Sequence, residues 1–171
     1  MTGSQYLMKE LNQMMISNQS STLLIAFVLI FILLLVSLRV FKVSFISLLP
    51  IAITVIILYG FLGWSGISLN VATTTIFSIT LGVGIDYAVH YSSVWKKFRD
   101  RGLSSSEAVD RAYTYTVRPI LANAFGLALG LSALQFSPLQ IHSYVSTLMW
   151  ISMISGVFLS LSFLPTILKK F

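Results

Sequence analysis

One carboxylate, Asp86, lies inside a long apolar stretch of the chain and is the residue best placed to do chemistry. It precedes the polar end of that stretch, near Val94, by about eight residues, or roughly 12 Å at ~1.5 Å of helical rise per residue. An ionised aspartate at the centre of a membrane helix costs about 2.5–3.5 kcal/mol on insertion scales. Because loss of solvation disfavours the charged form, a carboxyl group at this depth can alternate between its neutral and ionised states. Asp86 is therefore a candidate proton carrier.

Small and polar residues recur every four positions around Asp86. Ser78, Gly82, Asp86 and His90 would lie along one face of a helix. Lipid cannot satisfy such a face, so we expect it to look at other helices or at a wet cavity. Gly82 and Gly84 remove side-chain bulk beside the carboxylate, which would let a second helix or water come close.

A purely structural interpretation of the same residues stays open. Asp86 would then only form structural hydrogen bonds within the bundle. His90 would be an ordinary interfacial histidine, about one turn from the basic boundary. A proton relay through His90 is the alternative. One aspartate and one histidine on a helix are too few ligands for a metal site, so no metal is expected.

A second stripe of small residues, Ala122, Gly126 and Gly130, occurs further along the chain. The segment from Gly126 to Gly130 has the GxxxG spacing that lets membrane helices approach closely, so helix packing is the expected role. Asn123 borders this stripe and is the best second polar group for the bundle interior. It would interact with Asp86 if the two helices are neighbours, which spacing alone does not decide.

The composition is that of a membrane protein. Of 171 residues, 56% are hydrophobic and only 9% are charged, whereas soluble domains have about 25% charged residues. The chain has no cysteine, which excludes disulfides and thiol chemistry. Its net charge of +6 comes from short basic clusters between apolar runs, so nucleic acid is not an expected partner. No nucleophile elbow, phosphate-binding loop or zinc motif is present, and neither an enzyme nor a cofactor is expected.

The elements that must position these residues are helices. An all-α integral membrane fold is expected, with a lead-in at 1–19 and a transmembrane domain at 20–171. Apolar runs long enough to cross a bilayer predict five spans, at about 20–38, 43–62, 69–94, 119–136 and 144–168. Ser104 and Glu107 have the spacing of a capping box. They open a predicted short amphipathic helix at about 105–116, lying on the inner membrane surface or serving only as a solvated connector.

The basic residues predict the orientation. All but Lys9 lie beside or between apolar runs on what would be one side of the membrane, and the loops 63–70 and 137–143 contain no lysine or arginine. By the positive-inside rule, the amino terminus lies outside and the carboxyl terminus lies in the cytoplasm.

The segment from Leu81 to His90, with its Gly-x-Asp-Tyr element, resembles the fourth or tenth transmembrane helix of the RND superfamily of transporters. The resemblance is nearest to the MmpL-like exporters of hydrophobic compounds and covers nearly the whole chain. Further resemblances are Gly66–Asn70, Gly102–Ser104, Glu107–Val109, Val117–Ile120 and Leu164–Pro165.

The resemblance implies that the chain is the last five helices of one transporter half, a bundle similar to sterol-sensing domains. It implies that Asp86 carries protons, with support from Tyr87, to drive export of a hydrophobic or lipid-like substrate through the cytoplasmic membrane. The complementary half and an extracytoplasmic domain are the implied partners.

Two other interpretations remain. A SecD/SecF-like protein-export component is disfavoured by Tyr87 directly after Asp86 and by Val117–Pro119 downstream. A lipid-sensing or scaffolding bundle without transport predicts that Asp86 can be replaced without loss.

Overall fold

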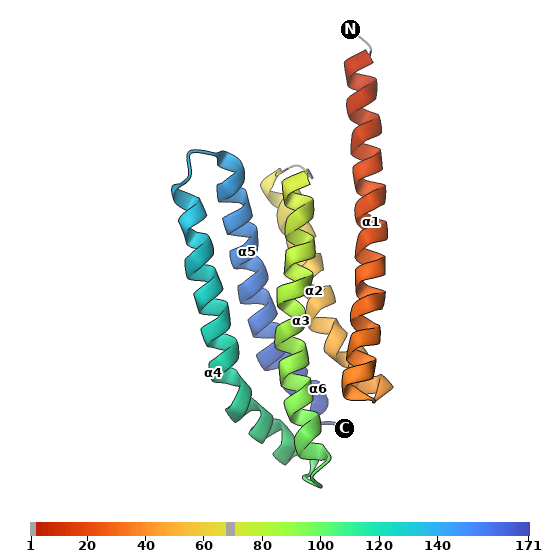
Figure 1. Cartoon of the computed structure of the whole chain (residues 1–171), viewed down its shortest axis with the longest axis vertical. Coiled ribbons are helices and arrows are strands. Elements are labelled where there is room, and N and C mark those ends of the chain that lie inside the picture. Colours follow the sequence, from red (N-terminus) through yellow and green to blue (C-terminus); the bar gives the residue numbers. More distant parts are fainter. Residues whose placement is uncertain (1–2, 68–70) are drawn as a thin grey trace.

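The chain forms a bundle of long helices lying side by side (Figure 1). The computed structural model describes residues 3–67 and 71–171, and every regular element in that part of the chain is helical. The elements are α1 (Gly3–Leu38), α2 (Phe41–Ser65), α3 (Val71–Arg99), α4 (Ser105–Ser132), the 3-10 helix η1 (Ala133–Phe136), α5 (Gln140–Phe158), the π-helix η2 (Leu159–Phe163) and α6 (Leu164–Leu168). The predicted all-α membrane bundle is confirmed at this level.

Four stretches in the described part of the chain are long and apolar enough to cross a membrane. They are Asn18–Leu38, Phe41–Ser65, Ser105–Phe136 and Gln140–Leu168. The fifth predicted span, α3, is not among them, although its 29 residues give it the length. Because α3 contacts α1, α2, α4 and α5, much of its surface faces protein and need not be apolar. Its crossing of the membrane remains a prediction.

The predicted capping box at the start of α4 is present. The Glu107 backbone N–H donates to Ser104 Oγ at 3.3 Å, and the Ser104 N–H donates to Glu107 Oε2 at 3.0 Å. The helix that begins there was expected to end at about 116, and that expectation is wrong. Helix α4 continues through Pro119 to Ser132.

The reason for this continuity is a buried stripe that runs through the proline without changing register. Its members are Ala108, Val109, Ala112, Thr116, Ile120, Ala124 and Ala128. A proline inside a helix removes one backbone hydrogen bond and bends the axis rather than ending the helix when packing continues on both sides. Figure 1 shows the lower part of α4 bent toward the end of α3. Whether residues 105–116 lie on the membrane surface stays a prediction.

Other boundaries also differ from those expected. The lead-in does not form a separate element, because α1 runs without a break from Gly3 into the first span. The predicted start of the third span near Leu69 lies outside the described residues, and α3 extends to Arg99. Helix α5 begins at Gln140, before the expected 144, and the helical path continues through η2 and α6 to Leu168.

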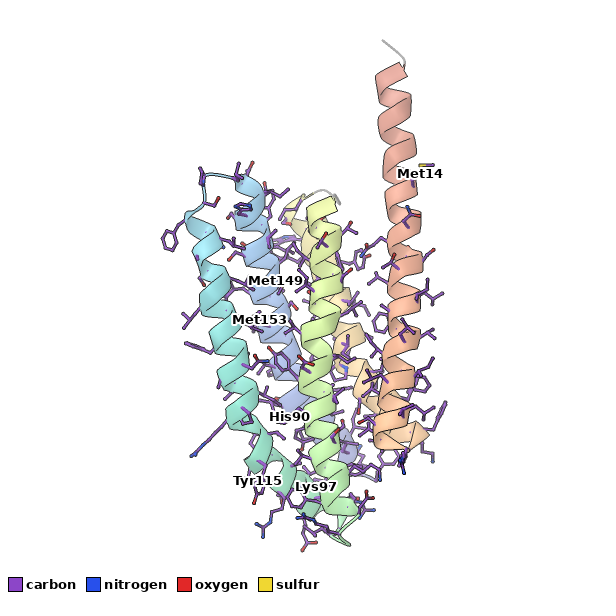
Figure 2. The ribbon with its side chains drawn as sticks, in the orientation of Figure 1. Met14, His90, Lys97, Tyr115, Met149 and Met153 are labelled. Atoms are coloured by element: carbon purple, nitrogen blue, oxygen red, sulfur yellow. The ribbon has the colours of Figure 1, made fainter. Side chains whose placement is uncertain are left out.

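The carboxyl terminus lies at the end of the bundle opposite the amino terminus (Figure 1). The C-terminal turn of α3 contains Lys96, Lys97 and Arg99, and Lys97 is labelled at this same end in Figure 2. The basic residues thus gather as the positive-inside rule expects. Which side of the membrane this end faces remains a prediction.

Helix α3 is held in place by close contacts on two of its sides. Toward α2, the hydroxyls of Ser47 and Ser92 are hydrogen-bonded at 2.6 Å, and Gly84 lies against Ile51. Toward α5, the ring of Tyr87 lies against Gly156. These contacts fix the rotation of α3 and therefore the direction in which its remaining face points.

Candidate functional site

The polar face predicted on α3 points away from these packed sides. The side chains of Ser78, Asp86 and His90 are exposed, and Gly82 is exposed with them. The face is therefore not covered by another helix of the described part of the chain, and the depth of Asp86 in the membrane stays a prediction. The physical reason is the rotation of α3, which places Tyr87, Ala88 and Tyr91 in the core and leaves Asp86 exposed.

Asp86 shares a groove with residues of α4. This groove, of about 380 Å³, is lined by Asp86, Tyr87, Val89 and His90 of α3 and by Pro119, Ile120 and Asn123 of α4. The two helices are thus neighbours, and Asn123 lies at the same groove as Asp86. In the described part of the chain, Asp86 makes no hydrogen bond or ion pair. Its carboxylate is left open to groups from outside the described part of the chain.

The groove brings together groups that are able to exchange protons. A carboxyl group and an imidazole, one turn apart on α3, can each take up and release a proton. The Asn123 amide across the groove can donate to an ionised carboxylate or accept from a protonated one. In the described residues, no group of three or more His, Cys, Asp or Glu side chains is arranged to hold a metal.

Tyr87 lines the same groove as Asp86, but its ring packs toward α5. Its side chain is 1% exposed, and a Cβ built on Gly156 would lie 3.5 Å from its Cδ2 atom. Its hydroxyl has no hydrogen-bond partner among the described residues. Tyr87 therefore packs α3 against α5, and its support of Asp86 remains a prediction.

The two glycines near Asp86 have different surroundings. A Cβ at Gly84 would lie 3.8 Å from Cγ1 of Ile51, so Gly84 serves the contact with α2 and not the carboxylate face. A Cβ at Gly82 would meet nothing within 4 Å. Only Gly82 leaves open space on the Asp86 side.

The small-residue stripe of α4 is also open. Ala122, Gly126 and Gly130 are exposed, and a Cβ at either glycine would meet nothing within 4 Å. The predicted close helix contact is therefore not made within the described part of this chain. Any helix that packs on this stripe has to come from outside it.

Pro119 also lines the groove, although the sequence predicted only that a helix begins there. It lies four residues before Asn123, so the two share a face of α4 and line the same groove. The spacing of four between Pro119 and Asn123 could have indicated this shared face, but only if the helix was known to continue through the proline.

Comparison with known proteins decides the family. The sequence model of the MMPL family matches residues 1–170. The chain belongs to the MMPL family. This confirms the resemblance to RND-type transporters found in the Gly-x-Asp-Tyr element and the segments after it.

Two curated proteins are similar to parts of this chain. A protein of Methanocaldococcus jannaschii, whose name describes a membrane protein, is 32% identical over 138 residues, covering 81% of this chain and 36% of the relative. Protein patched homolog 1 of Caenorhabditis elegans is 29% identical over 116 residues, covering 67% of this chain and 8% of the relative. The chain thus spans about a third of the first relative and a small part of the second.

Proposed function

We propose that this chain is the membrane part of one half of a proton-driven exporter of lipids or hydrophobic compounds, with Asp86 as the proton carrier. The observation that supports this most is the groove between α3 and α4, where the Asp86 carboxylate is exposed beside His90 and Asn123 and has no partner among the described residues. An ionisable residue on a membrane helix is costly, which makes a functional role the default explanation.

The proposed coupling is electrostatic. Protonation of Asp86 removes its charge, and a charge moved through the membrane potential gains about 2.3 kcal/mol per 100 mV. A free energy of that size shifts a two-state bundle by more than tenfold. Cycles of protonation and release at Asp86 would then alternate two arrangements of α3 and α4.

The proposal needs partners that cover the open faces of α3 and α4. The exposed polar stripe of α3 and the exposed glycines of α4 are unsuited to lipid and suited to another helix bundle. The complementary transporter half is the proposed partner, and an extracytoplasmic domain is proposed to select the substrate. The proposed location is the cytoplasmic membrane, with the basic end of the bundle in the cytoplasm.

The test is export driven by a pH gradient. The chain and the remainder of its transporter are reconstituted into vesicles that contain a fluorescent lipid analogue, and its movement is followed with and without an imposed gradient. We expect movement only with the gradient, and collapse of the gradient with an ionophore should stop it. Movement that is absent or independent of the gradient in a correctly assembled protein would instead favour a lipid-sensing or scaffolding bundle.

A further inference from the structure

A second groove lies between α4 and α5 and shares no lining residue with the Asp86 groove. It has a volume of about 500 Å³ and is lined almost entirely by apolar side chains, among them Val117, Leu121, Phe125, Met153 and Val157. Met153 is labelled between α4 and α5 in Figure 2.

The length of this groove corresponds to one leaflet of a bilayer. Along α5 and η2 it extends from Trp150 to Ser162, about 18 Å at ~1.5 Å of rise per residue. Half of a ~30 Å hydrocarbon core is about 15 Å. At the end of the groove farther from the basic end of the bundle, Trp150 is held in place, because its Nε1–H donates to Ser132 Oγ at 3.1 Å. The groove therefore fits one acyl chain of a lipid in the leaflet at the basic end of the bundle.

At the basic end, a polar pocket of about 480 Å³ adjoins the apolar groove. Tyr113, Leu161 and Ser162 line both spaces, so the two adjoin each other. Leu161 and Ser162 belong to the π-helix η2, and such local widening of a helix is frequent at functional sites. The apolar groove and the polar pocket thus meet at η2, directly after the end of α5.

The polar pocket contains one charge of each sign. Lys169 and Asp110 both line it, yet they form no ion pair with each other in the described part of the chain. The hydroxyls of Thr114 and Thr166 donate to the backbone carbonyls of Asp110 and Ser162, at 2.9 and 2.7 Å. Their oxygen lone pairs remain able to accept hydrogen bonds. A cation-binding group and an anion-binding group are therefore available in the same pocket.

We propose that this groove binds a bilayer phospholipid with a zwitterionic phosphoethanolamine headgroup. One acyl chain lies between α4 and α5, the phosphate binds Lys169, and the ammonium binds Asp110 and the threonine hydroxyls. A second copy of the chain covering the groove with an apolar helix would leave Lys169 and Asp110 without partners, so the lipid is the better match. This inference goes beyond the proposed export function and does not depend on Asp86.

The test uses Trp150 as the reporter inside the groove. The other two tryptophans, Trp64 and Trp95, are replaced by phenylalanine in the full chain, which is then reconstituted in phosphatidylcholine vesicles. Brominated phosphatidylethanolamine or brominated phosphatidylglycerol is titrated in, and quenching of Trp150 gives the relative affinity of the two lipids. We expect phosphatidylethanolamine to be preferred.

Two charge variants should change this preference in opposite directions. Asp110→Asn should lower the affinity ratio of phosphatidylethanolamine to phosphatidylglycerol about fivefold, and Lys169→Gln should raise it by a similar factor, as expected for one charge near a membrane surface. The matched controls are Asp100→Asn, at a carboxylate 2.8 Å from Lys96, and Lys170→Gln, since neither residue lines the pocket. The controls should leave the ratio unchanged.

Two results would overturn the proposal. An affinity ratio that is the same in all four variants would show a boundary lipid without headgroup selection. Protection of Trp150 from every brominated lipid, together with a dimer in the same vesicles, would show that a second copy covers the groove.

Discussion

Asp86 of α3 and Asn123 of α4 line the same groove, although neither side chain bonds to a residue of the described part of this chain. Their helices are joined beside the groove, where the Tyr91 hydroxyl of α3 donates to the Val109 carbonyl oxygen of α4 at 3.3 Å. An aspartate and an amide placed in this way can interact with water or with an incoming helix.

Replacement of Asn123 should impair proton-coupled transport without unfolding the bundle. Asn123→Leu removes a hydrogen bond to the charged form of Asp86 in the assembled protein, worth about 1.5–3 kcal/mol, so we expect at least a tenfold lower rate. Transport in vesicles is the measurement, and Leu129→Ala, at an exposed apolar position of the same helix, is the control. A normal rate in Asn123→Leu would remove Asn123 from the site.

The two glycines Gly156 and Gly82 should respond differently to a larger side chain. Gly156→Val should destabilise the chain by about 1–3 kcal/mol, because the added methyl groups meet the ring of Tyr87. Gly156→Ala should cost much less, since its Cβ would lie at an ordinary contact distance of 3.5 Å. Denaturation in detergent measures both variants.

Gly82→Val should leave the unfolding of the isolated chain nearly unchanged, because a Cβ there meets nothing within 4 Å. It should nevertheless weaken association with the complementary half, which a pull-down of the two halves measures. If Gly82→Val associates normally, the Asp86 face is not the surface that the other half covers.

The capping box of α4 should contribute to stability at the basic end. Ser104→Ala removes the side chain that accepts the Glu107 N–H and should cost about 1 kcal/mol. Faster hydrogen exchange in the first turn of α4 is the expected signature. Ser106→Ala, two residues along and outside the box, is the control, and equal exchange in the two variants would contradict the assignment.

Much of the fold could be predicted from the sequence, because the signals are local. Apolar runs of about twenty residues predicted the helices, and the spacing of Ser104 and Glu107 predicted the start of α4 correctly. The sequence did not predict that α4 continues through Pro119. That continuity depends on buried residues on both sides of the proline, Ala112 and Thr116 before it and Ile120 and Ala124 after it. Tertiary packing there outweighs the local signal of the proline.

The sequence predicted which residues share the candidate site, but it did not predict how that site is packed against other helices. The spacing of four correctly placed Ser78, Gly82, Asp86 and His90 on one face, because helical periodicity is a local property. Whether that face is buried depends on how α3 is rotated against α2 and α5, and the contacts of Gly84 and Tyr87 that decide it join residues distant in the sequence. The groove shared with Asn123 depends on the same packing.

The most direct measurement is proton uptake into vesicles that contain the assembled transporter, compared between the wild type and Asp86→Asn. The amide keeps the size of the side chain and removes its titrating proton, and Asp100→Asn, directly after the end of α3, serves as the control for loss of a carboxylate elsewhere. We predict that Asp86→Asn assembles normally and abolishes proton uptake, while Asp100→Asn retains it. Equal proton uptake in Asp86→Asn and the wild type would contradict the role of Asp86 as the proton carrier.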